Sequence, residues 1–506
     1  MSQLLYIVHN IRKSWAENKI MHGLFLDVSS AFDKVWHSGL LAKLYQAGVE
    51  DNFYQILSSY LDERKQVVVV EGQKSDLLDI KAGVPQGSRL GPLLFLIYMN
   101  DIINDIESDM LIFADDTSLF VSGIDPAQTA EIFNRDLLKI SAWARKWKVK
   151  FNTSKSKNII FSNKVLHNSP PLVFDDCLIE LVNNHRHLGL YLSSTLDWTM
   201  QVSQVCLKAN RKLSVLRSVS LLDRQTLDVL YKLTIRSVLD YALPVYCTTL
   251  KQTDLARLEN VQYRAAKVVT GAFHLTSRDK LNTELGWETI KKRCDILSLN
   301  IFHKIHKFET RPLIRSCMPI PDLEHKYPSR SKGGYIPFKR INQKFDNSFF
   351  PYTTLLWNSL PKIVKCKDLI YFKQYIKTEL KPPRFKHFSR GNKISNTLLT
   401  RIRVGRSDLY QHKFTIGLVD SPECDCHFRE ESPSHYFLDC FLYTIKRRSL
   451  FGLIEHYIPH FNNFTKSKKL DILLNGFDIY NVEFIQLNTT LTMAVQNFIL
   501  KTKRFN

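Results

Sequence analysis

Two apolar runs, MLIF at 110–113 and SLFV at 118–121, are separated by four residues that include adjacent acids, Asp115 and Asp116. Apolar runs on both sides of a polar turn predict a β-hairpin with the two acids at its tip. Neighbouring carboxylates raise each other's pKa unless a cation lies close to both. Because Asp is also a common turn residue, the pair alone is compatible with an ordinary solvated turn.

A third acid, Asp27, comes near the end of the apolar segment GLFLDV at 23–28, which is typical of a buried strand. Taken alone, this carboxylate could simply cap a following helix. If the strand lies beside the hairpin, however, three carboxylates converge on one point. Hard oxygen ligands of this kind suit Mg²⁺, which also binds phosphate oxygens, and two such ions suit phosphoryl transfer.

The charge of the chain indicates a polyanionic partner. Lys and Arg number 70 against 49 Asp and Glu, which gives a net charge of +21. Basic residues displace counterions from phosphates, so nucleic acid is the first candidate and a membrane surface the second. No apolar run reaches the length of about 18 residues typical of a membrane span, and no signal peptide is recognisable. With nine cysteines, an odd number, the sequence predicts an intracellular protein of a reducing compartment, nuclear or cytoplasmic.

The length of 506 residues predicts about three domains. Pro- and Ser-containing stretches at 318–333 and 381–392 are candidate linkers. Changes in the pattern of apolar and polar residues along the chain predict four regions: a mixed α and β region at 1–195, a helical region at 196–310, a mixed connector at 311–400 and a C-terminal region at 401–506.

Within the first region, local patterns predict three further elements. Apolar residues at helical spacing from Phe32 to Leu44 predict a helix that Gly48 ends. The runs at 65–70 and 77–83 flank a turn and predict a hairpin. A segment rich in Leu and Ile predicts a helix from about Leu90 to Ile106.

Five segments, in this order, resemble motifs of the reverse transcriptases of non-LTR (LINE-type) retrotransposons. They are FLDVSSAFDKVWH (25–37), AGVPQGSRLGPLLFLIYMND (82–101), LIFADDTSLF (111–120), FNTSKSKNIIFS (151–162) and HRHLGLYLS (185–193). The resemblance implies an α+β fold: a right-hand polymerase palm, an antiparallel sheet backed by helices, with partial fingers in 1–195. It also implies a helical thumb in 196–310, where IRSVLDYALPVY (235–246) resembles the family's thumb block.

The resemblance implies roles for the acids and for one base. Asp27 and Asp115 would be the main ligands of two Mg²⁺ ions, assisted by the backbone carbonyl of Val28, and Asp116 completes the triad. Lys155 would protonate the leaving pyrophosphate as a general acid. Lys157 is a close competitor, and either lysine could instead be a surface residue that only adds to the positive field.

Further site residues follow from the same resemblance. Phe32 would be the steric gate that excludes the 2′-OH of a ribonucleotide, although it could equally be an ordinary core Phe. A loop lining the incoming nucleotide and template base would contain Pro85, Gln86 and Gly87. The primer grip would contain His187, Leu188 and Gly189, where Gly allows close approach of the primer.

The implied activity is RNA-directed DNA polymerisation, with an RNA template, a DNA primer, the RNA–DNA hybrid and dNTPs as partners. Basic residues throughout 201–270 would lie along the duplex backbone without reading its sequence. Trp143 and Trp147, four residues apart in a basic segment, are expected to pack inward while the charges face solvent.

Near the C-terminus, Cys424, Cys426, His435 and Cys440 supply four ligands of the types that Zn²⁺ prefers. His427 is an alternative ligand, and a chance grouping of thiols is the competing interpretation. The segment also resembles the Cys–His knuckle found behind the polymerase in many non-LTR elements, which implies nucleic-acid binding or a structural zinc site.

Only about 22 residues precede the first motif, so we expect most of the fingers and the endonuclease of such elements to be absent. The main alternative is therefore a nucleic-acid-binding remnant without turnover. A viral RNA polymerase is a more distant alternative. The sequence names neither the element nor its template RNA or target site.

Overall fold

The computed structural model describes residues 1–164, 170–308, 312–322, 334–380 and 385–505. The chain divides into two units. The first contains Met1–Trp198, Pro312–Cys317 and Phe338–Phe350, and the second contains Thr199–Arg311, Met318–Pro337 and Pro351–Asn506. Parts of both candidate linkers, 323–333 and 381–384, lie outside the described residues, and the four-region division of the chain stays a prediction.

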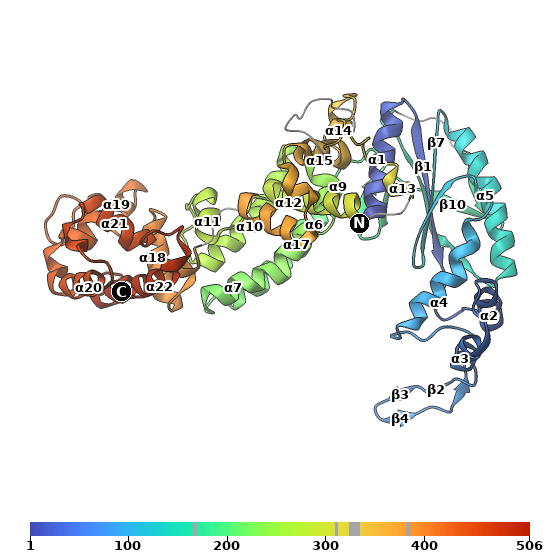
Figure 1. Ribbon diagram of the computed structural model, residues 1–506, viewed down its shortest axis with the longest axis horizontal. Helices are drawn as coiled ribbons and strands as arrows, with labels where there is room; N and C mark the ends of the chain where they lie inside the picture. Colours follow the sequence, from blue (N-terminus) through green and yellow to red (C-terminus); the bar gives the residue numbers. More distant parts are fainter. Residues whose placement is uncertain (165–169, 309–311, 323–333, 381–384, 506) are drawn as a thin grey trace. The chain divides into compact units, whose positions relative to one another are not determined.

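A six-stranded sheet is the centre of the first unit, with the strand order β6-β7-β1-β8-β10-β9 (Figure 1). Its neighbouring strands are antiparallel except for β8 and β10, which are parallel. The predicted mixed fold with a mainly antiparallel sheet is therefore confirmed. The sheet strands are β1 (Ile20–Val28), β6 (Asp109–Phe113), β7 (Asp116–Gly123), β8 (Phe151–Phe161), β9 (Leu172–Phe174) and β10 (Cys177–Leu181).

Helices cover both faces of this sheet. Successive strand residues point to opposite faces, and on β1 the buried Leu24 and Leu26 belong to the core shared with α5 (Pro126–Lys146). On the other face, Ser122 of β7 is hydrogen-bonded at 2.9 Å to Ser14 of α1 (Ser2–Ala16). Figure 1 shows α1 and α5 on the two sides of the strands. The remaining helices of this unit are α2 (His37–Gln46), α3 (Asp51–Leu61), α4 (Leu90–Met99), α13 (Pro312–Arg315) and α14 (Gln343–Asp346).

The helix expected from Phe32 begins later, at His37, so this part of the prediction is wrong. Residues 29–34 form turns, in which Ser30 has a φ of 51°. Their backbone is held by the loop at 82–84, because the Val84 N–H donates to the Phe32 carbonyl at 2.8 Å. The predicted end of the helix is confirmed: Gly48 has a φ of 84°, and its N–H donates to the Tyr45 carbonyl at 3.0 Å.

The helix predicted at 90–106 is also shorter than expected. Its α-helical part, α4, ends at Met99, and a 3₁₀-helix continues from Asn100 to Ile103. The helix begins where the Ser88 hydroxyl accepts the Gly91 N–H at 2.8 Å.

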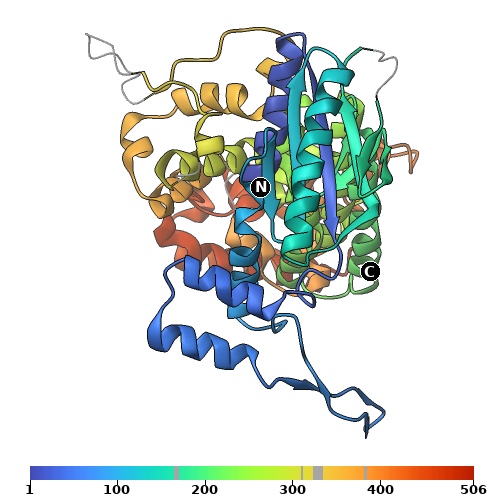
Figure 2. The same cartoon turned by 90° about the vertical axis from the view of Figure 1, so that its right-hand side faces the viewer.

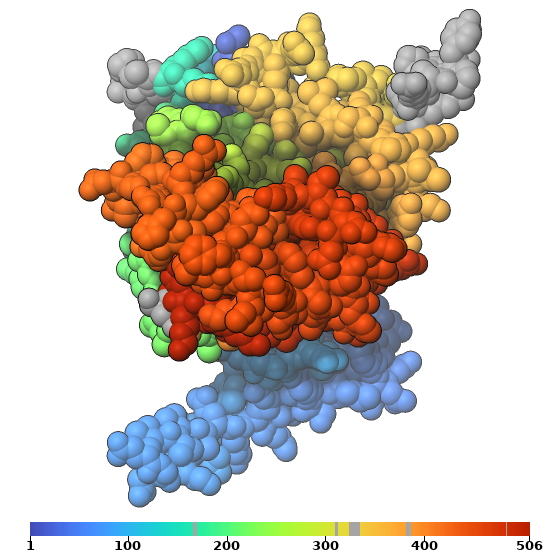
Figure 3. All heavy atoms as spheres, turned by 90° about the vertical axis from the view of Figure 1, so that its left-hand side faces the viewer, coloured from blue at the N-terminus to red at the C-terminus, as the bar shows by residue number. Residues whose placement is uncertain are grey.

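The hairpin predicted at 65–83 is present as two short ladders. Strand β2 (Lys65–Gln66) pairs with β5 (Leu78–Asp79), and β3 (Val69–Val70) pairs with β4 (Gln73–Lys74). Figures 2 and 3 show this hairpin projecting from the segment that contains α2 and α3. Its apolar side chains are exposed, including Val68 at 63% and Leu77 at 66%.

The second unit is helical, and the helical texture predicted for 196–310 is confirmed. Helix α6 packs on α10, and α12 packs on α17, while α22 contacts both α18 and α20. Its helices are α6 (Thr199–Ser218), α7 (Arg224–Leu230), α8 (Ser237–Asp240), α9 (Leu243–Tyr246), α10 (Gln252–Thr270), α11 (Arg278–Leu285), α12 (Ile290–Phe308), α15 (Phe349–Asn358), α16 (Lys362–Cys366), α17 (Leu369–Leu380), α18 (Lys393–Arg403), α19 (Tyr410–Thr415), α20 (Thr444–Tyr457), α21 (Lys466–Asn475) and α22 (Ile485–Thr502). The first two residues of α15 belong to the first unit. Among the described helices, none combines the length and the hydropathy that a membrane crossing requires.

Candidate functional site

The three predicted acids meet at one end of the sheet. Asp27, the penultimate residue of β1, is the register partner of Asp116, the first residue of β7. Asp115 lies in the turn between β6 and β7, next to Ala114, whose φ of 54° is unusual for a residue other than Gly. Both Asp115 and Asp116 are exposed, and the Asp27 side chain is 43% exposed. The acids are therefore accessible to a ligand.

Electrostatics confirm that these carboxylates are close to one another. The pKa of Asp116 is raised, first by partial burial and then by the negative charges of Asp115 and Asp27. Val28, whose carbonyl is a predicted ligand, is buried at the end of β1 directly after Asp27. A cation placed here would relieve the repulsion among the three carboxylates.

An irregularity in β8 places Lys155 beside Asp27. Phe25 of β1 pairs with Lys157, yet Asp27 pairs with Asn152 instead of residue 155, so β8 contains three extra residues at this point. The ammonium Nζ of Lys155 lies 4.0 Å from Asp27 Oδ2. The buried hydroxyl of Ser156 donates to the Asn152 carbonyl at 2.8 Å and accepts the Asp27 N–H at 3.2 Å.

Lys157, the other candidate for the general acid, is bound to different groups. Its Nζ lies 2.6 Å from Glu180 Oε2 on β10 and also donates to the Ser154 carbonyl at 2.8 Å. Of the two lysines, Lys155 is therefore the one whose ammonium reaches the acids.

The loop at 85–87 lies against the turn that contains Phe32. Phe32 is half-buried, and its ring centroid is 4.8 Å from that of Phe95 on α4. Gln86 donates from Nε2 to Asp33 Oδ1 at 2.8 Å. Pro85 and Gly87 flank Gln86, and Gly87 has a φ of 82°. The structure thus places the predicted gate and the predicted nucleotide loop together, with Phe32 anchored to the core.

The predicted primer grip is the tip of a separate hairpin, β11 (Asn184–His187) and β12 (Leu190–Ser193). Leu188 and Gly189 form its turn with φ values of 45° and 79°. His187 is only 3% exposed and lies 4.9 Å from the ring of Phe25 on β1. Burial, together with the smaller effect of neighbouring His185, lowers the pKa of His187 to about 3. The His187 ring is therefore a neutral packing group, and the turn residues Leu188 and Gly189 are partly exposed.

The predicted metal ligands near the C-terminus form a tight group. The ligand atoms of Cys424, Cys426, His435 and Cys440 all lie within 4.8 Å of one another, and all four residues are buried. The Sγ atoms of Cys424 and Cys440 are 3.9 Å apart, and Cys426 Sγ is 3.2 Å from His435 Nε2. His427, the alternative ligand, is 90% exposed and faces Glu423 at 3.5 Å, away from this group.

Other side chains fix the shape of this group. The Phe428 ring stacks on the His435 ring at 4.4 Å with an interplanar angle of 3°. Buried Glu431 accepts from Arg504 at 2.6 Å and from the Tyr410 N–H at 2.9 Å. These contacts hold the loop that carries His435.

The basic residues of 201–270 fall into two classes. Arg224 is paired with buried Glu284 at 2.7 Å, and Arg236 with Glu288 at 2.7 Å, so both are structural. By contrast, Lys208, Arg211 and Lys212 are exposed on α6 and remain available to a polyanion.

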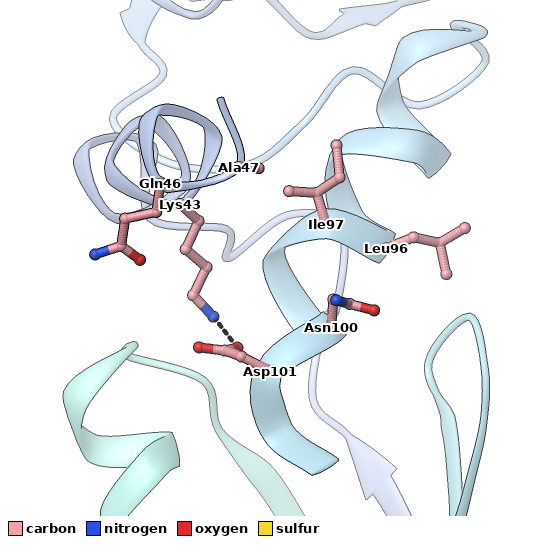
Figure 4. Close-up of a pocket in the computed structure, with 7 residues that line it drawn as sticks. All are labelled: Lys43, Gln46, Ala47, Leu96, Ile97, Asn100 and Asp101. Carbon is pink, nitrogen blue, oxygen red and sulfur yellow. Dashed lines mark hydrogen bonds and ion pairs between the residues drawn. The ribbon is translucent and has the colours of Figure 1, made fainter. Parts of the chain in front are cut away.

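A cavity of about 450 Å³ lies between α2 and α4, and its lining residues include none of the predicted site residues (Figure 4). At its wall, Lys43 Nζ is 2.5 Å from Asp101 Oδ1 and 3.9 Å from the ring centre of Trp147. Trp143 also contacts this ammonium, at 4.8 Å, so the expected inward packing of both Trp side chains is confirmed. Burial lowers the pKa of Lys43, and Asp101 opposes that shift. The other lining residues are Gln46, Ala47, Leu96, Ile97 and Asn100.

Sequence reasoning missed Asp33, Ser156 and Glu431. Each acts on a predicted residue or its loop through a hydrogen bond or an ion pair, and an isolated Ser or Asp carries no signal for such a role. Asp33 lies one residue after Phe32, and Ser156 one residue after Lys155, so proximity to a motif was the only available indication.

Comparisons with known proteins agree with these observations. A profile of the reverse transcriptase (RNA-dependent DNA polymerase) family matches residues 3–196. The probable RNA-directed DNA polymerase from transposon X-element of Drosophila melanogaster is 27% identical over 299 residues, covering 57% of this chain and 33% of that protein. The RNA-directed DNA polymerase from mobile element jockey of the same species is 30% identical over 290 residues, covering 54% and 31%. The chain thus spans about a third of the length of these relatives.

Among solved structures, telomerase from Candida tropicalis with a fragment of telomeric RNA is similar with a TM-score of 0.30 and 13% identity, over 61% of this chain and 52% of that one. A score of this size does not establish a common fold. The profile match identifies residues 3–196 as a reverse transcriptase region, and the transposon relatives and the five ordered motifs make this region similar to the reverse transcriptases of non-LTR retrotransposons.

Proposed function

We propose that the chain is an RNA-directed DNA polymerase that joins a dNTP to the 3′-hydroxyl of a DNA primer on an RNA template. The observation that carries this proposal is the register that sets Asp27 opposite Asp116, with Asp115 in the adjoining turn. Three accessible carboxylates at the end of a sheet, in a chain of net charge +21, suit a metal-assisted reaction on polyphosphates.

The residues present fit two Mg²⁺ ions. Carboxylate oxygens are the ligands that Mg²⁺ prefers, and the pKa of Asp116 is raised by partial burial and by the charges of Asp115 and Asp27, which a bound cation would offset. Asp27 and Asp115, with the carbonyl of Val28, would hold the ions, and Asp116 would complete the set. When bound, the ions would activate the primer hydroxyl and stabilise charge on the leaving group.

Other predicted residues would position the incoming nucleotide and select deoxynucleotides over ribonucleotides. Phe32, fixed against Phe95, would exclude the 2′-OH of a ribonucleotide by contact. Gln86, held by Asp33, would face the incoming nucleotide and template base together with Pro85 and Gly87.

Two further groups complete the proposed reaction site. Lys155 would donate a proton to the departing pyrophosphate, supported by its ammonium lying 4.0 Å from Asp27. The turn at Leu188 and Gly189, seated on the sheet by His187, would contact the primer backbone.

In the second unit, the exposed Lys and Arg side chains of α6 support a thumb that contacts the phosphates of the RNA–DNA hybrid. Cys424, Cys426, His435 and Cys440 would hold Zn²⁺ as a structural staple, because their ligand atoms are already gathered and buried. The nine cysteines are all free thiols, which supports action in a reducing, intracellular compartment.

The test is primer extension on an RNA template with Mg²⁺, comparing Asp115→Asn with Asp176→Asn. Asp176 is a matched control, because it is exposed in the turn between β9 and β10 of the same sheet. We expect Asp115→Asn to lower extension at least about a hundredfold, while Asp176→Asn retains it. Equal extension by both variants would refute the assignment.

The same experiment separates the polymerase from a binding remnant. The basic surface of α6 does not depend on the acids, so both functions predict salt-sensitive nucleic-acid binding. Binding without any extension by the parent chain would favour the remnant.

A further inference from the structure

A buried arginine in the first unit lacks the partners that its charge requires. Arg12, on α1, is 3% exposed. Its Nη2 donates to the Leu196 carbonyl at 3.4 Å, but Nε and Nη1 have no hydrogen-bond partner within the described part of the chain. The guanidinium also lies 5.0 Å from the ring centre of Trp15, whose own N–H is used by the Phe161 carbonyl at 3.0 Å.

Such an arrangement is unfavourable unless something else neutralises the charge. A guanidinium carries five N–H donors, and buried donors without acceptors are costly. Burial lowers the pKa of Arg12 to about 10, so the group remains charged at neutral pH. Breaking or omitting the partner of a buried charge is among the larger destabilising effects in proteins.

Arg12 lines a cavity of about 260 Å³ whose wall is rich in donors. The wall comes from α1, from the segment after β8 and from the start of α14. Its residues are Arg12, Trp15, Asn163, Asn342, Gln343 and Lys344, and no acid is among the described lining residues. Two positive charges and three amides thus border one hollow.

Among the residues that the structure describes, the neighbouring groups do not neutralise the cavity. Asp346, two residues beyond Lys344, accepts the Ile341 N–H at 3.2 Å and is not part of the wall. Asn342 uses its Oδ1 to accept the Phe345 N–H at 2.9 Å. Lys344 is exposed, and no ion pair of it occurs within the described residues.

The cavity is separate from the three acids. It adjoins the end of β8 at Phe161, which pairs with Met21 of β1. Asp27 lies six residues farther along β1, which corresponds to about 20 Å. Anion binding here is therefore independent of the polymerase chemistry proposed above.

We propose that this cavity is a binding site for a phosphate group, held by Arg12 and Lys344. The planar fork of Arg matches two phosphate oxygens, and Lys adds a point charge. Water could occupy the hollow, but it would not offset two positive charges. The phosphate could belong to a free phosphate compound or to a nucleic-acid backbone, which present the same oxygens.

The first experiment is calorimetric titration of the full chain with inorganic phosphate at constant ionic strength, without added divalent metal. We expect one saturable site, weakened about tenfold in Lys344→Gln and in Arg12→Lys. Lys13→Gln is the matched control, because Lys13 is the exposed residue next to Arg12 on α1 and is not part of the wall. It should bind phosphate like the parent.

The second arm identifies the source of the phosphate with an oligothymidylate of ten nucleotides. If the site takes a nucleic-acid phosphate, Lys344→Gln weakens oligonucleotide binding and lowers its salt dependence by about one charge. If the site takes a free phosphate compound, Lys344→Gln weakens the binding of inorganic phosphate but leaves oligonucleotide binding unchanged. Because Lys344 is exposed, its variant is expected to fold even if Arg12→Lys does not. Unchanged affinity of Lys344→Gln in both arms, or equal weakening by Lys13→Gln, would overturn the proposal.

Discussion

Removing one thiol from the Cys/His group tests the zinc assignment most directly. With Zn–S bonds of about 2.3 Å and a Zn–N bond of about 2.0–2.1 Å, a tetrahedral site sets two sulfurs about 3.8 Å apart and a sulfur and nitrogen about 3.6 Å apart. The corresponding distances here are 3.9 Å between Cys424 and Cys440 and 3.2 Å between Cys426 and His435. The ligands therefore need to move by only a few tenths of an ångström to bind the ion.

The expected effect follows from mass action. Free zinc at about 100 to 1,000 times its dissociation constant would stabilise the folded state by about 2.7 to 4.1 kcal/mol. For a unit of this size, that corresponds to a change in Tm of about 4–7 °C. A chelator should lower the Tm of the parent by this amount, and Cys440→Ser should lose both the zinc and the chelator effect.

Cys294→Ser is the matched control, because Cys294 and Cys440 are both 0% exposed but Cys294 lies in α12, outside the group. Each substitution buries a hydroxyl at a cost of about 1–2 kcal/mol, yet only Cys440→Ser should lose metal. Zinc content is measured by mass spectrometry, and melting by circular dichroism with and without chelator. Zinc bound equally to both variants, or a parent whose Tm ignores the chelator, would refute the reasoning.

Three further predictions concern the proposed polymerase site. Lys155→Met should lower the extension rate about a hundredfold in single-turnover kinetics, and Lys157→Met should lower it less than about threefold. A larger loss in Lys157→Met would show that the bulge in β8 does not decide which lysine is the general acid. Asp116→Asn should slightly raise the Tm at pH 7, since the raised pKa means that ionisation disfavours the folded state. The gain should vanish below about pH 4, which melts across pH will measure, and a loss of stability at pH 7 would contradict the prediction. Phe32→Ala should increase ribonucleotide use relative to deoxynucleotide use at least about tenfold in competition assays, whereas an unchanged ratio would leave Phe32 as a core residue.

Much of the acid site could be predicted from the sequence because strands and tight turns have local signatures. The hairpin around Asp115 and the strand ending near Asp27 were both visible as apolar runs beside acids. The strands are neighbours, and their register sets Asp27 opposite Asp116. This pairing is a contact between segments about 90 residues apart, which the family resemblance supplied and the local patterns did not.

The preference for Lys155 over Lys157 came from the family resemblance, because the local strand pattern could not separate the two lysines. Residues two apart in a regular strand lie on the same face, so alternation treats both lysines alike. The three extra residues of β8 separate them, and the polar segment NTSKSK carries no mark of that irregularity.

The predicted start of α2 was wrong for a different reason. Phe32 and Trp36 have helical spacing, but backbone contacts with the distant loop at 82–84 outweigh that local preference. Likewise, the Gln86–Asp33 hydrogen bond joins two motifs that are 53 residues apart. Tertiary contacts of this kind become visible only when the chain is folded.

The position of β1 inside the sheet has a consequence for biosynthesis. β1 (Ile20–Val28) leaves the ribosome before its partners β7 and β8, which begin at Asp116 and Phe151. At about 5–20 residues per second, β1 waits on the order of ten seconds before its second neighbour emerges. During that interval its apolar residues and its free backbone edge are exposed to other nascent chains, so α1 and cellular chaperones must shield them until β8 completes the sheet.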